Sequence, residues 1–235
     1  MSLAPLASLF AGLCLSTACA TALARPAVIE LYTSEGCSSC PPAEKLLEDV
    51  AKRPDVLALS FHVDYWDDLG WRDRFSMHEA TRRQQDAART LALTTVGTPQ
   101  WIVEGRSVVW GASQSALDRT LKSPRTDLGV EIMRDGQDLL VRAAAPSSAQ
   151  DYTVYLIGYL PKAVTAIGRG ENAGRTLTEV NVVRYIRAIG TSRDSAREWR
   201  VPLAQLPSDA THVAVLLQVS ASGEIVGARS IERGS

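Results

Sequence analysis

The chain has 235 residues, of which 46% are hydrophobic and 22% charged, and its formal net charge at pH 7 is −1. These fractions are typical of a globular protein, and the balanced charge leaves no basic footprint, so we expect no nucleic-acid partner. The sequence contains no repeat period and no low-complexity tract.

The first 24 residues have the pattern of a secretory leader. Residues 3–23 are almost uncharged, and Ala22-Leu23-Ala24 before Arg25 has the small-x-small form of a signal-peptidase site. We therefore expect a cleaved leader and a secreted, periplasmic protein; an uncleaved anchor and a lipoprotein modified at Cys19 are the alternatives. No later segment approaches the roughly 20 apolar residues that span a bilayer, so we expect no stable membrane span after leader removal.

A Cys-x-x-Cys pair follows the first apolar run of the mature chain. Cys37-Ser38-Ser39-Cys40 lies between residues 27–32, an expected strand, and residues 41–51, whose apolar spacing predicts a helix. Free N–H groups and the positive dipole end of a helix N-terminus stabilise a thiolate, so we expect Cys37 to be a nucleophile at neutral pH. One helical turn brings Cys40 within reach of it, and the pair can then cycle between dithiol and disulfide.

Three roles are open for this pair. The other two cysteines lie in the leader, so a four-thiolate zinc site within one mature chain is excluded. A mixed site would need a histidine at finger spacing, which none of the three has; these are His62, His78 and His212. A structural disulfide across so short a loop would constrain the unfolded chain little. We favour a redox-active pair and assign neither a metal nor a cofactor, with the structural disulfide and the metal site as alternatives.

The first half reads as alternating strands and helices. Strands are expected at residues 27–32 and 56–63, and helices at 41–51 and 75–93. A hairpin then joins residues 100–103 to 107–110, and Ser113 caps a last helix that ends at residue 121. This order predicts a mixed α/β sheet flanked by helices.

Two of these motifs in combination resemble the thioredoxin fold. Cys37-Ser38-Ser39-Cys40 follows a strand, and Thr98-Pro99 directly precedes the hairpin; the likeness covers residues 26–123. It implies that the Thr98–Pro99 bond is cis, that Pro99 packs against the sulfurs, and that Thr98 and Pro99 shape a groove in which a substrate strand pairs. It also implies that Cys37 attacks and Cys40 resolves. Threonine before this proline is similar to periplasmic disulfide isomerases and thiol peroxidases.

A longer pattern is more specific than either motif. Residues 30–42, 62–66 and 98–100 together resemble a family of secreted bacterial proteins with a thioredoxin-like fold and no assigned function, domain of unknown function 1223. One position departs from thioredoxins, which bury an aspartate where this chain has Leu31. Glu30 should point to the opposite face of the strand. Proton transfer would then use Glu35, Asp64 or water.

Residues 64–73 contain two tryptophans, one tyrosine and four aspartates, and they leave the carboxyl end of the second strand, where open α/β sheets place ligands. Two interpretations stay open. The segment is a lid or docking surface beside the cysteines, or its aromatic residues hold the loop on the core. We interpret His62 as a core histidine rather than as a ligand or base.

The second half lacks helical periodicity. We expect a hairpin of residues 128–134 with 138–143, further strands at 151–159, 177–189, 210–219 and 225–230, and a small antiparallel sheet or sandwich built from them. Residues 168–175 read as a surface or inter-domain loop. The expected domains are the signal peptide at 1–24, a thioredoxin-like domain at 25–124 and a β-rich domain at 125–235.

The function hypothesis is a secreted thiol–disulfide oxidoreductase that exchanges disulfides with protein substrates and an unidentified redox partner, in either direction. The main alternative is a metallochaperone that carries Cu(I) between the two thiolates with help from His62, because soft thiolates select Cu(I). A third hypothesis is a non-catalytic binding module that retains a structural disulfide.

Overall fold

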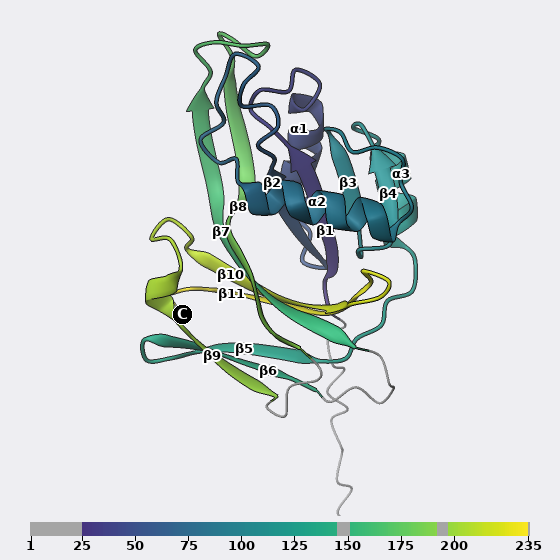
Figure 1. Cartoon of the computed structure of the whole chain (residues 1–235), viewed down its shortest axis with the longest axis vertical. Coiled ribbons are helices and arrows are strands. Elements are labelled where there is room, and N and C mark those ends of the chain that lie inside the picture. Colours follow the sequence, from purple (N-terminus) through teal and green to yellow (C-terminus); the bar gives the residue numbers. More distant parts are fainter. Residues whose placement is uncertain (1–24, 145–150, 192–196, 235) are drawn as a thin grey trace, which may run out of the picture.

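The computed structural model describes residues 25–144, 151–191 and 197–234 (Figure 1). The expected leader, with Cys14 and Cys19, lies outside these residues. The elements of the first half are β1 (Ala27–Thr33), α1 (Pro41–Val50), β2 (Val56–His62), α2 (His78–Thr90), β3 (Gln100–Val103), β4 (Ser107–Trp110) and α3 (Gln114–Leu121). Those of the second half are β5 (Val130–Asp135), β6 (Asp138–Ala143), β7 (Tyr152–Ala166), β8 (Thr176–Thr191), β9 (Glu198–Pro202), a 3₁₀ turn (Leu203–Gln205), β10 (His212–Val219) and β11 (Ile225–Glu232). No helix in the described part of the chain is long and apolar enough to cross a membrane.

The larger of two sheets has eight strands in the order β11-β10-β7-β8-β2-β1-β3-β4, and the smaller one has the order β5-β6-β9. In the larger sheet β2 pairs in parallel with β1 and with β8, whereas the remaining neighbours pair antiparallel. The fold is therefore a mixed α/β arrangement with a large, mostly antiparallel sheet.

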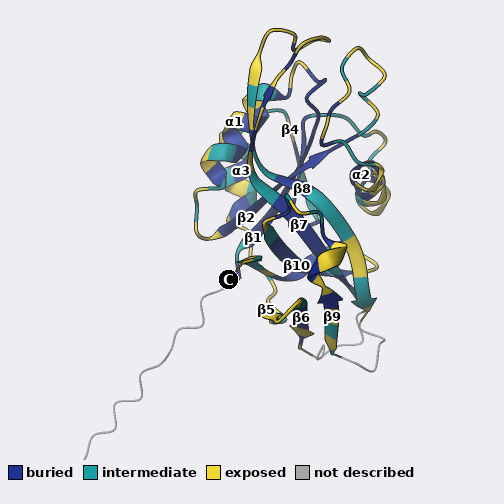
Figure 2. Cartoon of the chain, turned by 90° about the vertical axis from the view of Figure 1, so that its left-hand side faces the viewer, coloured by how far each residue is buried: buried dark blue, intermediate teal, exposed yellow. Residues whose placement is uncertain are grey.

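The helices cover both faces of the sheet, so its central strands are buried on both sides (Figure 2). Leu31 of β1 packs in the same cluster as Leu47 of α1 and Leu117 of α3. Tyr32, the next residue of β1, lies in the cluster on the opposite face, which contains Ala80 of α2. Burial on both faces explains why β1 and β2 are continuous apolar runs rather than alternating ones.

The smaller sheet packs against β7, β10 and β11 of the larger sheet. Val213 and Val215 of β10 face it, whereas Ala214 and Leu216 lie on the side of α2. The sequence analysis did not predict β9, whose five residues offer only two apolar side chains, Trp199 and Val201, alternating with more exposed ones.

The two halves of the chain share the larger sheet. β8 joins β2 through one parallel pair, Ser60 with Val182, and the side chain of Asn181 donates a hydrogen bond of 2.8 Å to the carbonyl oxygen of Ala58. The second-half strands are thus divided between two sheets, in contrast to the separate β unit that we expected. The boundary at residue 124 falls in the connection between α3 and β5, and the domain assignment stays a prediction.

α2 is shorter than the sequence predicts. The apolar and polar pattern suggested residues 75–93, but the helix begins at His78 because Met77 is extended and because the N–H group of Phe75 donates to the side chain of Asp73. Ser113 caps α3 as expected, by accepting a hydrogen bond from the N–H group of Ala116.

A second connection between the halves lies at the β3–β4 turn. Buried Arg25 forms an ion pair with Glu104 of this turn and donates a 2.6 Å hydrogen bond to the carbonyl oxygen of Ile225. Gly105, which follows Glu104 in the same turn, has a φ of +66°. A Cβ atom placed there would lie 1.9 Å from the carbonyl oxygen of Gly223 in the β10–β11 turn. The two turns therefore meet through backbone atoms.

We predict that Gly105→Ala destabilises the fold far more than Gly136→Ala. Both glycines have positive φ, which costs an alanine about 1 kcal/mol, but a Cβ at Gly136 would meet nothing within 4 Å. Backbone atoms cannot move aside as a side chain can, so the loss at Gly105 should exceed the loss at Gly136 by about 2 kcal/mol or more. Urea unfolding of both variants measures the difference. Equal losses would show that the two turns separate without cost.

Candidate functional site

The cysteines lie in a tight loop between β1 and α1, which we call the cysteine loop (residues 34–40). The N–H group of Cys37 donates to the carbonyl oxygen of Ser34 at 3.1 Å, and that of Cys40 donates to the carbonyl oxygen of Cys37 at 3.2 Å. These bonds place the two sulfurs together, and they form a disulfide. Cys37 is 0% and Cys40 1% exposed, whereas Ser38 and Ser39 between them are exposed.

Cys40 is the N-cap residue of α1, and two prolines follow it. Proline has no N–H group, so Pro41 and Pro42 remove two donors that a helix N-terminus would otherwise offer to an anion. The hydroxyl of Ser39, 3.4 Å from the sulfur of Cys37, is a nearby polar group that can replace them. Stabilisation of a Cys37 thiolate therefore depends more on polar groups of the cysteine loop, and less on the N–H groups of the helix N-terminus, than the sequence pattern indicated.

The Thr98–Pro99 bond is cis, as the resemblance implies, and Pro99 is buried. Trp66 connects this segment to the cysteine loop. Its indole N–H donates to the hydroxyl of Thr98 at 2.9 Å, and its Cβ atom lies 3.3 Å from the position of a Cβ at Gly36. Trp66 thus contacts both Thr98 and the loop that carries Cys37, two parts of the site that the sequence proposed.

The rest of the segment 64–73 is also attached to the cysteine loop. The indole N–H of Trp71 donates to the buried carboxylate of Glu35 at 2.7 Å. Asp73 accepts the N–H group of Glu35 at 2.8 Å. Both tryptophans are half-buried and hydrogen-bonded, so the aromatic residues hold the segment in place beside the cysteines. Asp64 lies elsewhere, bonded to Thr81 of α2.

The turn between β7 and β8, which we call the hairpin tip (residues 167–175), contacts the cysteine loop from the second half of the chain (Figure 1). The side-chain amide of buried Asn172 donates to the carbonyl oxygens of Glu35 and Cys37, each at 2.9 Å. The carboxylate of Glu171 accepts the N–H group of Ser38 at 3.2 Å. The polar loop that we interpreted as a surface or inter-domain loop is therefore part of the site, at a contact between the two halves of the chain.

A buried cluster of charged groups lies at the carboxyl ends of β1 and β2. Its centre is His62, fully buried, whose Nδ1 atom lies 2.7 Å from Asp73 and whose Nε2 atom lies 4.0 Å from Glu179 of β8. Glu44 of α1 is also buried, 3.5 Å from the hydroxyl of Ser60. We call Glu44, His62, Asp73 and Glu179 the buried acid cluster.

Burial and charge oppose each other within the buried acid cluster. Burial alone would lower the pKa of His62, but the charge and hydrogen bond of Asp73, together with the other carboxylates, raise it to about 10. Burial would raise the pKa of Asp73, yet the charge of His62 holds it below its usual range. Burial raises the pKa of Glu44, and it raises that of Glu179 to about 8 against the opposing charge of His62. At neutral pH the cluster therefore contains an imidazolium–carboxylate pair and a protonated Glu179.

Three of the site residues are absent from our interpretation of the sequence. Glu44 could have been found, because it lies four residues after Cys40 and thus on the same helix face. Glu179 and Asn172 carry no local signal, since β8 reaches the site only through the tertiary pairing of β8 with β2. His62 lies in the core as we interpreted it, but its partners are charged.

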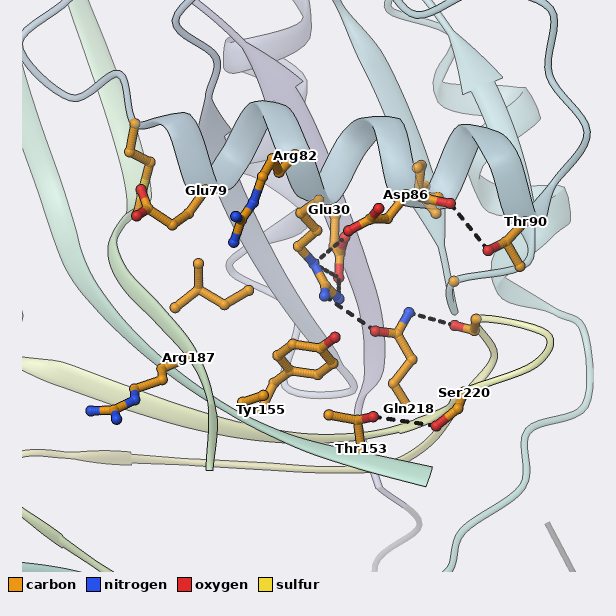
Figure 3. A pocket seen from close by; sticks show the side chains of 18 of the residues that line it. Glu30, Glu79, Arg82, Asp86, Thr90, Thr153, Tyr155, Arg187, Gln218 and Ser220 are labelled. Carbon is orange, nitrogen blue, oxygen red and sulfur yellow. Dashed lines mark hydrogen bonds and ion pairs between the residues drawn. The ribbon is translucent and has the colours of Figure 1, made fainter. Parts of the chain in front are cut away.

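A separate cavity of about 1170 Å³ lies between α2 and the face of β7, β8 and β10 (Figure 3). The guanidinium of Arg83 lies within it, bonded to Glu30 and Gln218 and 5.0 Å from the ring centre of Tyr155. Glu30 thus points away from the face of Leu31, as predicted. The residues that line this cavity do not include any of the cysteine loop, so we treat it as distinct from the disulfide site.

We predict that Glu179→Gln changes how folding stability depends on pH. Burial raises the pKa of Glu179 to about 8 in the folded chain, whereas a glutamate in the unfolded chain has a pKa of 4.5. Folding therefore binds a proton between these values, and the free energy of unfolding should fall as pH rises through this window, by at most about 1.4 kcal/mol per pH unit. Glutamine does not ionise, so the variant should lose this part of the slope.

Chemical denaturation at several pH values measures the slope. His62 contributes in both proteins, since its raised pKa stabilises the fold below pH 6.5 and this contribution is lost as pH rises towards about 10. Glu131→Gln, on an exposed position of β5, is the matched control and should keep the slope of the original chain. Identical slopes for all three proteins would show that Glu179 is ionised in the fold at neutral pH.

Comparison with known proteins identifies a family and two similar folds. A crystal structure of a structural genomics target from Agrobacterium tumefaciens is 29% identical, with a TM-score of 0.72 over 89% of this chain and 95% of that chain. HBP35 of Porphyromonas gingivalis is 14% identical, with a TM-score of 0.58 over 90% of this chain and 76% of that chain, which is a likeness of fold alone. None of the curated proteins matches the sequence. The family described as "Protein of unknown function (DUF1223)" matches residues 28–218, and the chain therefore belongs to the DUF1223 family.

Proposed function

We propose that this protein is a thiol–disulfide oxidoreductase, secreted to the periplasm, which exchanges disulfides with protein substrates through Cys37 and Cys40. One observation carries the proposal. The two cysteines form a disulfide in a loop whose backbone is held by Asn172 and Asp73, directly before a helix. A disulfide that closes so short a loop contributes little to stability, so its chemistry is the better reason for its position.

The arrangement around the disulfide supports a thioredoxin-like first half. β1, α1, β2, α2, β3, β4 and α3 follow one another in the order that the resemblance implies, with the cysteines after β1 and a cis-proline before β3. β1 lies between β2 and β3 in the sheet. Thr98, bonded to Trp66 and half-buried, would be the residue beside which a substrate strand pairs.

In the oxidised state the reaction begins with a substrate thiolate that attacks the sulfur of Cys37. A bond forms between these two sulfurs, the bond between Cys37 and Cys40 breaks, and the electron pair leaves on Cys40, which takes up a proton. A second substrate thiolate then attacks the substrate sulfur of the mixed disulfide and releases Cys37. The substrate loses two electrons and becomes a disulfide, while the protein becomes a dithiol. A substrate disulfide reverses each step.

Glu44 and Glu179 would supply and accept the proton. Glu44 closes the first turn of α1, where its N–H group donates to the carbonyl oxygen of Cys40 at 3.0 Å. Burial raises the pKa of both carboxyls, that of Glu179 to about 8, which favours the protonated form of each. This pair would perform the task that thioredoxins assign to the aspartate missing at Leu31, in place of Glu35, which is bonded to Trp71.

We predict that Cys40→Ser, expressed with its leader in the native compartment, accumulates mixed disulfides with its partners. Without the thiol of Cys40, the bond between Cys37 and a substrate cannot be resolved from within the protein. Cys37→Ser is the matched control and should trap almost nothing, because the proposed mechanism assigns the bond with a substrate sulfur to Cys37 and gives Cys40 only the resolving step. Non-reducing gels followed by mass spectrometry of the adducts measure the outcome and identify the substrates.

The same pair of variants tests the alternatives. If neither variant forms adducts and the reduced original chain binds one equivalent of Cu(I), the metallochaperone is correct. If neither forms adducts and no copper binds, the disulfide is structural and the protein is a binding module. Either result would contradict the oxidoreductase.

A further inference from the structure

Among the described residues, the second half of the chain contributes two parts to the site: Glu179 on the strand β8 and the hairpin tip, which is a loop. We propose that it is the specificity element of the disulfide: Asn172 is a positioning residue that holds the cysteine loop closed, and displacement of the tip is required for a polypeptide substrate but not for a small thiol. The inference rests on the proposed function for its biological meaning.

Asn172 is bonded as a clamp. Both N–H groups of its amide are used, one on the carbonyl oxygen of Glu35 and one on that of Cys37, each at 2.9 Å, and its own oxygen accepts a 3.1 Å hydrogen bond from Arg175. The residue is 1% exposed, so these bonds are shielded from water. Without these donors the carbonyl oxygen of Glu35 would lose its hydrogen bond to Asn172 and that of Cys37 would keep only the N–H group of Cys40, and the loss of hydrogen bonds at buried acceptors costs free energy. The closed loop is therefore stabilised by this one side chain.

The remaining contacts of the hairpin tip extend the clamp along both sides of the cysteine loop. Glu171, which is exposed, accepts the N–H group of Ser38 at 3.2 Å. Gly170 lies against Trp71, with the Cβ atom of the tryptophan 3.0 Å from the position of a Cβ at this glycine. Trp71 is in turn bonded to Glu35. The hairpin tip, Trp71 and the cysteine loop thus form one packed unit.

The chemistry of exchange requires this unit to open for a large substrate. An attacking sulfur must approach Cys37 in line with the disulfide bond, yet Cys37 is fully buried in the closed state. A flexible small thiol can enter through a small fluctuation beside exposed Ser38 and Ser39. A polypeptide that pairs beside Thr98 carries backbone on both sides of its cysteine, so it needs the space that Asn172 and Glu171 occupy.

The hairpin tip is built to move as a unit. It is closed by its own hydrogen bonds, from the N–H group of Ile167 to the carbonyl oxygen of Arg175 at 2.9 Å and from that of Gly174 to that of Ile167 at 2.8 Å. It contacts the cysteine loop directly through the hydrogen bonds of Asn172 and Glu171, and its glycines Gly168 and Gly170 pack against Trp71. Separation would therefore break these hydrogen bonds and, on the apolar side, expose the part of Trp71 that the two glycines cover.

The experiment compares two reductants of the Cys37–Cys40 disulfide: dithiothreitol, and reduced, unfolded ribonuclease A. In each case two thiols of the reductant become a disulfide and the two cysteines of the protein become thiols. Asn172→Ala should raise the rate with reduced ribonuclease A about tenfold or more, the change expected from the loss of two hydrogen bonds in the closed state, and the rate with dithiothreitol less than about threefold. Asn172→Asp, which keeps the shape but lacks the donors, should have the same effect as Asn172→Ala.

Two further variants make the result specific. Glu171→Ala removes only the acceptor for Ser38 and, because Glu171 is exposed, should not disturb folding; its effect should have the same sign and be smaller. Thr176→Ala, on the same hairpin at an exposed position paired with Ala166, is the matched control and should change neither rate. Thermal unfolding of each variant is measured in parallel.

Either of two results would overturn the inference. Equal acceleration with both reductants would mean that Asn172→Ala destabilises the fold in general, and no acceleration with either would mean that Asn172 does not control access to the disulfide. The outcome is independent of the trapping experiment. Trapped partners with an unchanged ratio of rates would leave the oxidoreductase without a specificity element at the hairpin tip. If the ratio of the two reduction rates changes but no partners are trapped, the hairpin tip controls access to the disulfide and the proposed function is wrong.

Discussion

The pairing of β8 with β2 is the constraint on which the rest of this structure depends. It consists of a single parallel register pair, Ser60 with Val182, supported by the side chain of Asn181 and by an apolar cluster that includes Phe61 and Val183. β7 and β8 have 15 and 16 residues, which corresponds to roughly 50 Å of extended chain. Because the contact with β2 lies in the middle of β8, one end of the hairpin reaches the cysteine loop while the other contributes to the core beneath the smaller sheet.

The same pairing brings a further carboxyl group to the ends of β1 and β2. Glu179 enters the interior beside His62, where Glu44 and Asp73 are already present. Burial of several carboxyl groups is costly unless they are paired or protonated. The cluster meets this condition with one imidazolium, one ionised partner and carboxyls whose pKa values are raised. The charged core of the site is thus a product of both halves of the chain, and neither half would contain it alone.

Local signals predicted the elements of the first half with small errors. The spacing of apolar residues located β1, β2 and α1, the cap at Ser113 located α3, and glycine in the turn located the β3–β4 hairpin. The errors have physical causes. α2 begins three residues later than its polarity pattern suggests because Asp73 forms a turn with Phe75. β9 was missed because its five residues contain only two alternating apolar side chains, Trp199 and Val201, which is a short run from which to recognise a strand. The polar residues of the hairpin tip were assigned to a surface or inter-domain loop. Nothing in their sequence reveals that the side chain of Asn172 is buried against the backbone of the cysteine loop.

By itself the sequence determined the chemistry that is available and where it begins: two cysteines one helical turn apart after a buried strand, a proline before a hairpin, and a family pattern across residues 30–100. These features depend on neighbours within a few residues, and a single chain encodes them directly. Only the tertiary structure decided what surrounds the disulfide. The partners of the cysteine loop, Asn172 and Glu171, lie more than 130 residues away along the chain, and Glu179 reaches His62 from the same hairpin. Such contacts arise when strands from distant parts of the chain pair to bury their apolar faces, and the polar residues at the ends of those strands are carried along.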